Sequence, residues 1–315
     1  MDVKKILFDT DIGGDCDDAG ALALLHRLCD RGEADLLAVT ACYASPYVAG
    51  CIDAINRYYG REVPVGIFYG ATKEDRGSYA GLLCDTFPSR YPSAAYGTAE
   101  AAPDSVSVLR RALSRAEDDS VTFVVTGSLA TAAALAVSAG DEISPLGGRE
   151  LIRKKIHRTV VMGGRFFESW PMGIHANNEP GDKLVDWEWN IRESVRDAQT
   201  VCRLWPGELV FSSYEIGTYI KTMVGYNTAA PQDDPVRLAY HVYSGGEGRC
   251  SWDHTAILDA VRPDTYWHYH AYGRITVDDE GVTRFVKDPD TRHTYLLPRA
   301  DYEEIRAVID GLVFP

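Results

Sequence analysis

Five aspartates follow a short apolar run near the start of the chain, and their spacing indicates a metal site. Residues 6–8 (ILF) lead into them, and they are Asp9, Asp11, Asp15, Asp17 and Asp18. Carboxylates this close together repel one another unless a cation lies among them, some are protonated or some side chains point away. Gly13 and Gly14 allow the tight backbone path that several carboxylates need to converge on one ion. Oxygen ligands alone favour a hard cation, Ca²⁺ or Mg²⁺, and a solvated acidic turn at a helix start is the alternative.

Length and charge limit the classes of protein to which the chain can belong. Its 315 residues are 45% hydrophobic and 25% charged, which is typical of a globular protein with one large α/β domain or two ordinary ones. The net charge of −14 leaves no basic face for a polyanion, so neither nucleic acid nor an anionic membrane is an expected partner. No apolar stretch approaches the length of a membrane span.

The number and spacing of the cysteines indicate the cellular compartment of the protein. There are seven, an odd number, and no two have CxxC spacing, which is typical of reduced thiols in the cytosol rather than of a disulfide framework or a zinc site. We therefore expect a cytoplasmic protein. The apolar run after Lys5 is too short for a signal-peptide core, which also favours the cytoplasm. An exported precursor with a trimmed signal peptide is the alternative. Cys16, inside the acidic cluster, is expected to be a passive small residue.

The elements that must position the aspartates alternate along the chain. Expected strands cover residues 4–9, 34–43, 64–68, 121–125, 156–162 and 208–213. Expected helices begin at Ala19 and Val48 and continue with 104–116, 129–139 and 193–204. Such alternation predicts a single α/β domain over residues 1–315, with an open, mainly parallel Rossmann-like sheet and helices on both faces. After residue 271 we expect a strand pair and a last helix near 301–311.

Polar residues follow three of the expected strands. The aspartates follow the first strand, Thr126 follows VTFVV, and Met162 with two glycines follows IHRTVV. Open α/β sheets bind ligands beyond the carboxyl ends of their strands, so these residues are expected to share one site at that edge. Two irregular stretches, 70–98 and 164–187, are expected to be binding loops or lids.

Four motifs occur in an order that is typical of one enzyme family. They are DTDIGGDCDDA at 9–19, TGSLATAAALA at 126–136, EWN at 188–190 and WDHTA at 252–256, and VVMGG at 160–164 lies between the second and the third. They resemble the DxDxGxDDA, TGPLTNLA, E-F-N and H-D-P-L-A segments of the nucleoside hydrolases, the inosine–uridine-preferring N-ribohydrolase family, with two extra residues in the first. The resemblance implies an enzyme that hydrolyses the N-glycosidic bond of ribonucleosides and releases the base and ribose.

The resemblance also implies a role for each matched residue. Ca²⁺ would be bound by the carboxylates of Asp11, Asp18 and Asp253 and by the carbonyl of Thr126. Asp11 would be the general base that takes a proton from a metal-activated water, and Asp9 would orient the ligands from a second layer. The residues implied to contact the nucleoside are Asp17, Met162, Asp182, Glu188, Asn190 and Trp252.

Trp252 departs from the family pattern at the leaving-group step. Many members have a histidine there, a proposed proton donor to the departing base. Tryptophan cannot act as an acid, but it can stack on a purine or pyrimidine ring. We therefore expect Trp252 to position the base, while the proton comes from solvent or from another residue, with His175 and His254 as candidates.

Asp182 is a second departure. It falls where many relatives carry asparagine near the 5′-hydroxyl, and together with Glu188 it would repel a 5′-phosphate, so nucleosides are expected over nucleotides. A solvated loop acid is the alternative for Asp182. Asp15 lies within the two extra residues and has no predicted role.

Two other functions remain open from the sequence. The missing histidine is compatible with a catalytically impaired, Ca²⁺-dependent protein that binds nucleosides or ribose. A haloacid-dehalogenase-type phosphatase also begins with a strand ending in DxD, but it usually has Thr or Val where this chain has Gly13, and its downstream lysine and acid pair are not evident. By resemblance the partner is a small-molecule nucleoside, and the assembly is a homodimer or homotetramer.

Overall fold

The computed structural model describes residues 2–73, 78–167, 174–175 and 184–314. The strands of the main sheet are β1 (Lys4–Thr10), β2 (Ala34–Ala41), β3 (Val65–Ile67), β4 (Val121–Val125), β5 (Ile156–Met162), β8 (Glu208–Ser212), β11 (Trp267–Tyr269) and β14 (His293–Pro298). Three short pairs lie outside it: β6 (Ile174–His175) with β7 (Leu184–Val185), β9 (Lys221–Thr222) with β10 (Arg249–Cys250), and β12 (Arg274–Val277) with β13 (Thr283–Val286).

Helices fill the connections between strands. They are α1 (Asp17–Asp30), α2 (Val48–Tyr58), α3 (Tyr79–Thr86), the 3₁₀ turn η1 (Ser93–Ala95), α4 (Ser105–Arg115), α5 (Ala130–Val137), α6 (Gly148–Lys155), α7 (Trp189–Glu193), α8 (Val195–Leu204), α9 (Tyr214–Thr218), α10 (Tyr226–Ala229), α11 (Pro235–Ser244), α12 (Trp252–Val261) and α13 (Tyr302–Val313). No helix in the described ranges is both long and apolar enough to cross a membrane.

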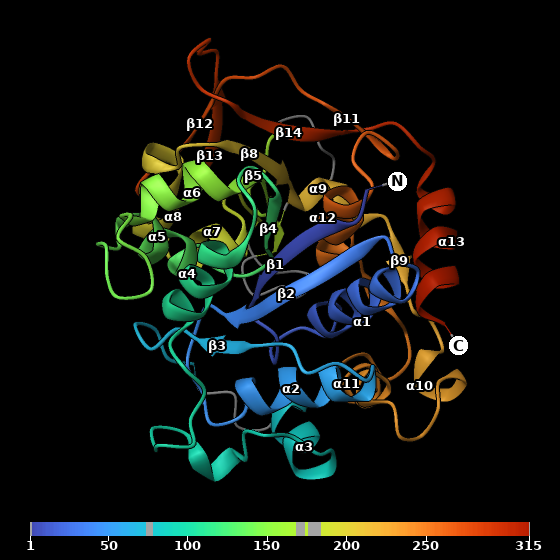
Figure 1. Cartoon of the computed structure of the whole chain (residues 1–315). Helices are drawn as coiled ribbons and strands as arrows, with labels where there is room; N and C mark the ends of the chain where they lie inside the picture. The colour runs from blue at the N-terminus through green and yellow to red at the C-terminus, as the bar shows by residue number, and fades with distance from the viewer. Residues whose placement is uncertain (1, 74–77, 168–173, 176–183, 315) are drawn as a thin grey trace.

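The main sheet has the strand order β11-β14-β8-β5-β4-β1-β2-β3 (Figure 1). All neighbouring strands are parallel except β11 and β14, which are antiparallel. Side chains alternate between the two faces of each strand, so Ile6 and Phe8 of β1 pack into one core while Leu7 packs into the other. Helices α1, α2, α11, α12 and α13 contribute to the first core and α4, α5, α6 and α8 to the second. The predicted open, mainly parallel α/β sheet is confirmed.

The direction of the chain reverses between β1 and β4. From β1 the chain proceeds outward to β2 and β3, and it then returns to β4 on the other side of β1 and continues to β5 and β8. Such a reversal opens a crevice beyond the carboxyl ends of the two central strands. The acidic loop follows β1 and Thr126 follows β4, so the topology brings both to the carboxyl ends of these neighbouring strands.

Two differences from the prediction concern strand β14 and helix α3. The predicted strand pair is present as β12 and β13, but β14 was missed, and it extends the main sheet by pairing with β8. Its sequence HTYLLP has polar residues at the start and a proline at the end, so it lacks the apolar run of a central strand. Helix α3 lies within residues 70–98, which were expected to be irregular.

The seven cysteines, all of which lie in the described ranges, form no disulfide, and Cys16 is fully buried. Burial, together with the neighbouring charges of Asp15 and Asp17, raises the pKa of the Cys16 thiol. A thiol that is kept protonated in this way is a poor nucleophile. The structure therefore supports a passive packing role for Cys16.

His26 makes the stability of the fold depend on pH. Its ring is buried in α1, where Nε2 lies 2.9 Å from Oδ1 of Asn56 and the ring stacks on Tyr59. Burial lowers the pKa of His26 to about 3, whereas a histidine in an unfolded chain has a pKa of about 6.5. The unfolded state therefore binds more protons, and the stability that is fully present above about pH 6.5 is lost as the pH falls towards the folded pKa.

We expect the free energy of unfolding, measured by urea denaturation, to decrease less steeply with falling pH below about pH 6.5 in His26→Gln than in the native protein. Glutamine cannot take up a proton but retains a donor for Asn56. Other groups titrate in the same way in both proteins, so the difference between the two slopes reports on His26. Parallel slopes would contradict the prediction.

Candidate active site

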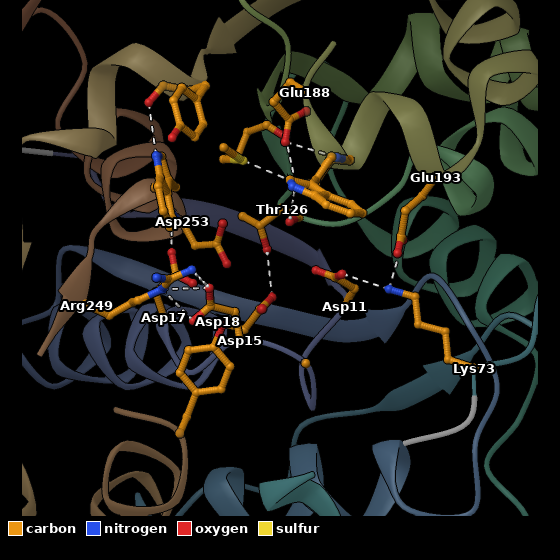
Figure 2. Close-up of a pocket in the computed structure, with 17 residues that line it drawn as sticks. Asp11, Asp15, Asp17, Asp18, Lys73, Thr126, Glu188, Glu193, Arg249 and Asp253 are labelled. Atoms are coloured by element: carbon orange, nitrogen blue, oxygen red, sulfur yellow. Dashed lines mark hydrogen bonds and ion pairs between the residues drawn. The ribbon is translucent and has the colours of Figure 1, made fainter. Parts of the chain in front are cut away.

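A pocket of about 240 Å³ lies at the carboxyl ends of β1, β4 and β5 (Figure 2). Acidic side chains line one part of it and aromatic side chains another. The predicted site residues that line the pocket are Asp11, Asp17, Asp18, Thr126, Met162, Glu188, Asn190, Trp252 and Asp253. Asp182 lies outside the described residues, and Asp9 does not line the pocket. Residues from both ends of the sequence thus meet at one edge of the sheet, as the strand-end argument predicts.

Three buried carboxylates form a compact group in the pocket. Asp17, Asp18 and Asp253 each place an oxygen within 4.8 Å of the others. The first two lie in the first turn of α1 and the third in the first turn of α12, where the helix dipole favours negative charge. Burial, followed by the repulsion of neighbouring carboxylates, raises the pKa of all three. A cation among them would relieve both effects.

The surrounding donors fit a hard divalent cation. The carbonyl of Thr126 accepts a hydrogen bond of 2.8 Å from Nδ2 of Asn190, which leaves its second lone pair for another partner. Asp18 accepts hydrogen bonds from the hydroxyls of Thr10 and Thr126. Carboxylate and carbonyl oxygens are the ligands that Ca²⁺ and Mg²⁺ prefer. The buried aspartates together with Thr126 can therefore bind a metal of this kind.

Asp11 is held by an ion pair that the sequence does not reveal. Nζ of Lys73 lies 2.9 Å from Oδ2 of Asp11 and 2.8 Å from Oε2 of Glu193 (Figure 2). The clustered acids are Asp17, Asp18 and Asp253, whereas the predicted ligand set contained Asp11 and assigned Asp17 to the ribose. The charge of Asp11 nevertheless contributes to the raised pKa of Asp18 and of Asp253. Asp11 thus belongs electrostatically to the same cluster.

Asp9 does not belong to the pocket lining. It is fully buried, and its carboxyl accepts a hydrogen bond from the hydroxyl of Thr40 in β2. Burial raises the pKa of Asp9 to about 8. The hydrogen bond to Thr40 ties it to the neighbouring strand rather than to a predicted metal ligand, and its predicted orienting role stays a prediction.

The EWN motif forms the start of α7 at one wall of the pocket. The carboxylate of Glu188 caps this helix and accepts hydrogen bonds from the backbone N–H groups of Asn190 at 2.9 Å, Ile191 at 3.2 Å and Gly164 at 3.1 Å. Burial raises the pKa of Glu188 to about 7, against the opposing effect of these three donors. Nδ2 of Asn190 also donates to the carbonyl of Met162 at 3.2 Å. The three predicted sugar contacts of this wall are thus joined in one hydrogen-bonded unit.

The opposite wall is aromatic and contains an arginine. Trp252 is only 9% exposed, and its Nε1–H donates to the carbonyl of Tyr214 at 3.0 Å. The guanidinium of Arg249 lies 4.8 Å from the centroid of the Trp252 ring and 5.3 Å from that of Tyr243. Arg249 also forms a bidentate ion pair with Asp15, which had no predicted role. Arg249, Tyr214 and Tyr243 line the pocket without belonging to any predicted motif.

His254 is not a suitable proton donor. Its side chain is fully buried in α12 and does not line the pocket. Neither ring nitrogen has a hydrogen-bond partner in the described ranges, and burial lowers the pKa of His254 to about 3. This geometry corrects the suggestion that His254 protonates the departing base. The side chain of His175, the other candidate, lies outside what the structure describes.

Fold and site together define an α/β protein with a carboxylate cluster at the switch point of a parallel sheet, suited to hold a metal beside a small polar substrate. Residues 6–294 match the inosine-uridine preferring nucleoside hydrolase family, and the chain belongs to it. It is therefore a nucleoside hydrolase, an enzyme that acts on the N-glycosidic bond. A search of curated proteins returns no significant sequence match.

Solved structures of this class share the fold. A plant nucleoside hydrolase is 17% identical, with a TM-score of 0.68 over 99% of both chains. The inosine-uridine preferring nucleoside hydrolase from Bacillus anthracis is 19% identical, with a TM-score of 0.68 over 99% of both chains. A purine-preferring ribonucleoside hydrolase from Gardnerella vaginalis is 17% identical, with a TM-score of 0.68 over 98% of this chain and 99% of that one. Because the sequence identities are this low, the similarity to these structures shows a shared fold alone.

Proposed function

We propose that the protein is a Ca²⁺-dependent hydrolase that cleaves ribonucleosides to free base and ribose, with Asp11 as the general base. The observation that carries this proposal is the buried carboxylate group of Asp17, Asp18 and Asp253, which lies in one pocket with Asp11. Membership of the nucleoside hydrolase family supports the reaction type. The choice of Ca²⁺ and the individual residue roles are our proposal.

The ion would be held by Asp18, Asp253, the carbonyl of Thr126 and Asp11. When bound, a divalent cation of this type makes a water molecule more acidic and orients it. Asp17 accepts a hydrogen bond from the backbone N–H of Asp253 through one carboxylate oxygen. Its other oxygen is proposed to accept hydrogen bonds from the ribose hydroxyls.

Asp11 is proposed to take the proton from the attacking water. Its carboxylate is held in the pocket by the ion pair of 2.9 Å with Lys73. Glu193 offers Lys73 a second carboxylate, so the ammonium can leave Asp11 and still keep an ion-pair partner. As the bond from C1′ to the base nitrogen breaks, positive charge develops on the sugar, and the surrounding carboxylates stabilise it.

The two walls of the pocket are proposed to hold the two halves of the substrate. Met162, Glu188 and Asn190 would contact the ribose, because they form a rigid unit beside the aspartates. Trp252 has little exposed surface, so we propose that it supports the base site mainly from behind. This modifies the expectation that its ring alone stacks on the base.

The direct test is a substrate panel with and without a calcium chelator. Purified protein would be incubated with inosine, adenosine, guanosine, uridine, cytidine and inosine 5′-monophosphate, and released reducing sugar would be measured. We expect ribose from the nucleosides, loss of activity with the chelator, recovery with Ca²⁺, and no release from the monophosphate.

Two outcomes would point to the other functions. Tight binding of ribose or nucleosides in equilibrium dialysis, without release of sugar, would indicate a binding protein, as the missing histidine allows. Mg²⁺-dependent release of phosphate from the monophosphate would indicate a phosphatase. Either result would contradict the proposed hydrolysis.

A further inference from the structure

Among the described residues that line the pocket, no histidine is present to protonate the departing base. Trp252 cannot donate a proton by acid catalysis, and His254 is buried away from the pocket. We propose that Arg249, positioned by Asp15, binds the departing base and stabilises the negative charge that develops on it. This inference rests on the proposed function and assigns the leaving-group step to a residue outside the family motifs.

The guanidinium of Arg249 is fixed from several sides. Nε lies 3.0 Å from Oδ1 and 2.7 Å from Oδ2 of Asp15, and Nη2 donates to the same carboxylate. The guanidinium carbon also lies over the rings of Trp252 and Tyr243. Arginine in such a bidentate and stacked setting loses little further freedom when it binds a ligand. Asp15 is thus a positioning residue, and it places a rigid set of N–H donors.

Part of this donor set remains available to a ligand. Nη1 of Arg249 donates to no atom in the described ranges, and the side chain is 20% exposed. Arg249 lines the same pocket as the clustered aspartates and lies next to Asp17 and Asp15 (Figure 2). A nucleobase bound beside the sugar site would present ring nitrogen or carbonyl oxygen acceptors. The position and the chemistry of Arg249 therefore both suit the base half of the substrate.

The proposed cleavage accounts for every bond and proton without an acidic side chain that protonates the base. The bond between C1′ and the base nitrogen breaks, and its electron pair passes to the base. The water oxygen forms the new bond to C1′, and its proton passes to Asp11. The base anion is stabilised by the N–H donors of Arg249, which stays protonated throughout, and it takes a proton from solvent after release.

The competing explanation is that the pair of Arg249 and Asp15 only braces the acidic loop against β10. The chain offers a matched control in Arg262, whose Nε and Nη2 lie 2.7 Å and 2.9 Å from the two oxygens of Glu33. That pair is also half-buried and bidentate, and it does not line the active-site pocket. Arg262→Met therefore reports what the loss of such a pair costs when only structure is affected.

The test compares two leaving groups. Inosine and uridine release poor leaving groups, whereas p-nitrophenyl β-D-ribofuranoside releases a stable phenolate that needs little help. We expect Arg249→Met to lower kcat/KM for the nucleosides about 100-fold or more, the loss typical of a removed donor to a developing charge. The same variant should change the p-nitrophenyl substrate less than about 3-fold, and Arg249→Lys, which retains the positive charge, should recover part of the nucleoside activity. Arg262→Met should leave the ratio between the substrates unchanged.

The outcomes separate this inference from the proposed function. Equal losses on both substrates in Arg249→Met, or no loss on the nucleosides, would overturn the leaving-group role while leaving nucleoside hydrolysis intact. A native protein that hydrolyses neither class of substrate in the presence of Ca²⁺ would overturn the proposed function, and this inference with it. A loss confined to the nucleosides supports both.

Discussion

Asp11→Asn is expected to lower kcat for inosine about 10³-fold, within the range by which a positioned general base accelerates a reaction. The amide has nearly the same shape as the carboxylate but cannot accept the proton of the attacking water. Lys73 also loses one of its two carboxylate partners, although Glu193 still holds it. Steady-state kinetics at saturating Ca²⁺ would measure the effect, with binding of ribose followed in parallel.

Glu193→Gln is the matched control, because it neutralises the other partner of Lys73 while leaving Asp11 unchanged. We expect this variant to retain kcat within about 10-fold, since its carboxylate takes no proton in the proposed mechanism. Similar losses in both variants would mean that the Lys73 network, rather than proton transfer to Asp11, limits the reaction. A fully active Asp11→Asn protein would exclude Asp11 as the base.

Asp18→Asn is expected to change stability in opposite directions with and without Ca²⁺. In chelator the variant should be more stable than the native protein by about 1–2 kcal/mol, because one of several buried, mutually repelling carboxylates is gone. Asparagine retains an acceptor oxygen for the hydroxyl of Thr10. With Ca²⁺ at 100 times its Kd, the native protein should gain about 2.7 kcal/mol, and the variant should gain much less. Turnover should be lost together with the Ca²⁺ effect.

Thermal unfolding with Ca²⁺ or with chelator would check this prediction. Asp35→Asn in β2 is the control, because it removes the same unit of charge from an exposed position. We expect this control to show the full Ca²⁺ effect and an unchanged stability in chelator. A Ca²⁺-dependent rise in Tm that is equal in Asp18→Asn and in the native protein would exclude Asp18 as a ligand.

Local patterns in the sequence were sufficient to predict the framework. The strands near residues 121–125 and 156–162 match β4 and β5, because apolar runs bounded by polar residues are local signals. The alternation of strands and helices led to the parallel sheet, and the strand-end rule placed the acidic loop near Thr126. Strand β14 was missed because its sequence lacks an apolar run. Its place in the sheet depends on pairing with β8, which is distant in the sequence, so no local pattern indicates it.

The sequence by itself therefore determined the fold class, the family and the edge of the sheet where the site lies, because all three depend on short motifs in a fixed order. Only the tertiary structure decided which charges meet in the pocket. Lys73 pairs with Asp11 across 62 residues, and Arg249 pairs with Asp15 across 234. In the sequence these side chains are indistinguishable from ordinary solvated charges, since an ion pair leaves no local pattern. Their pairing follows from the tertiary fold, which brings the loops after β1 and β3 and strand β10 to one pocket.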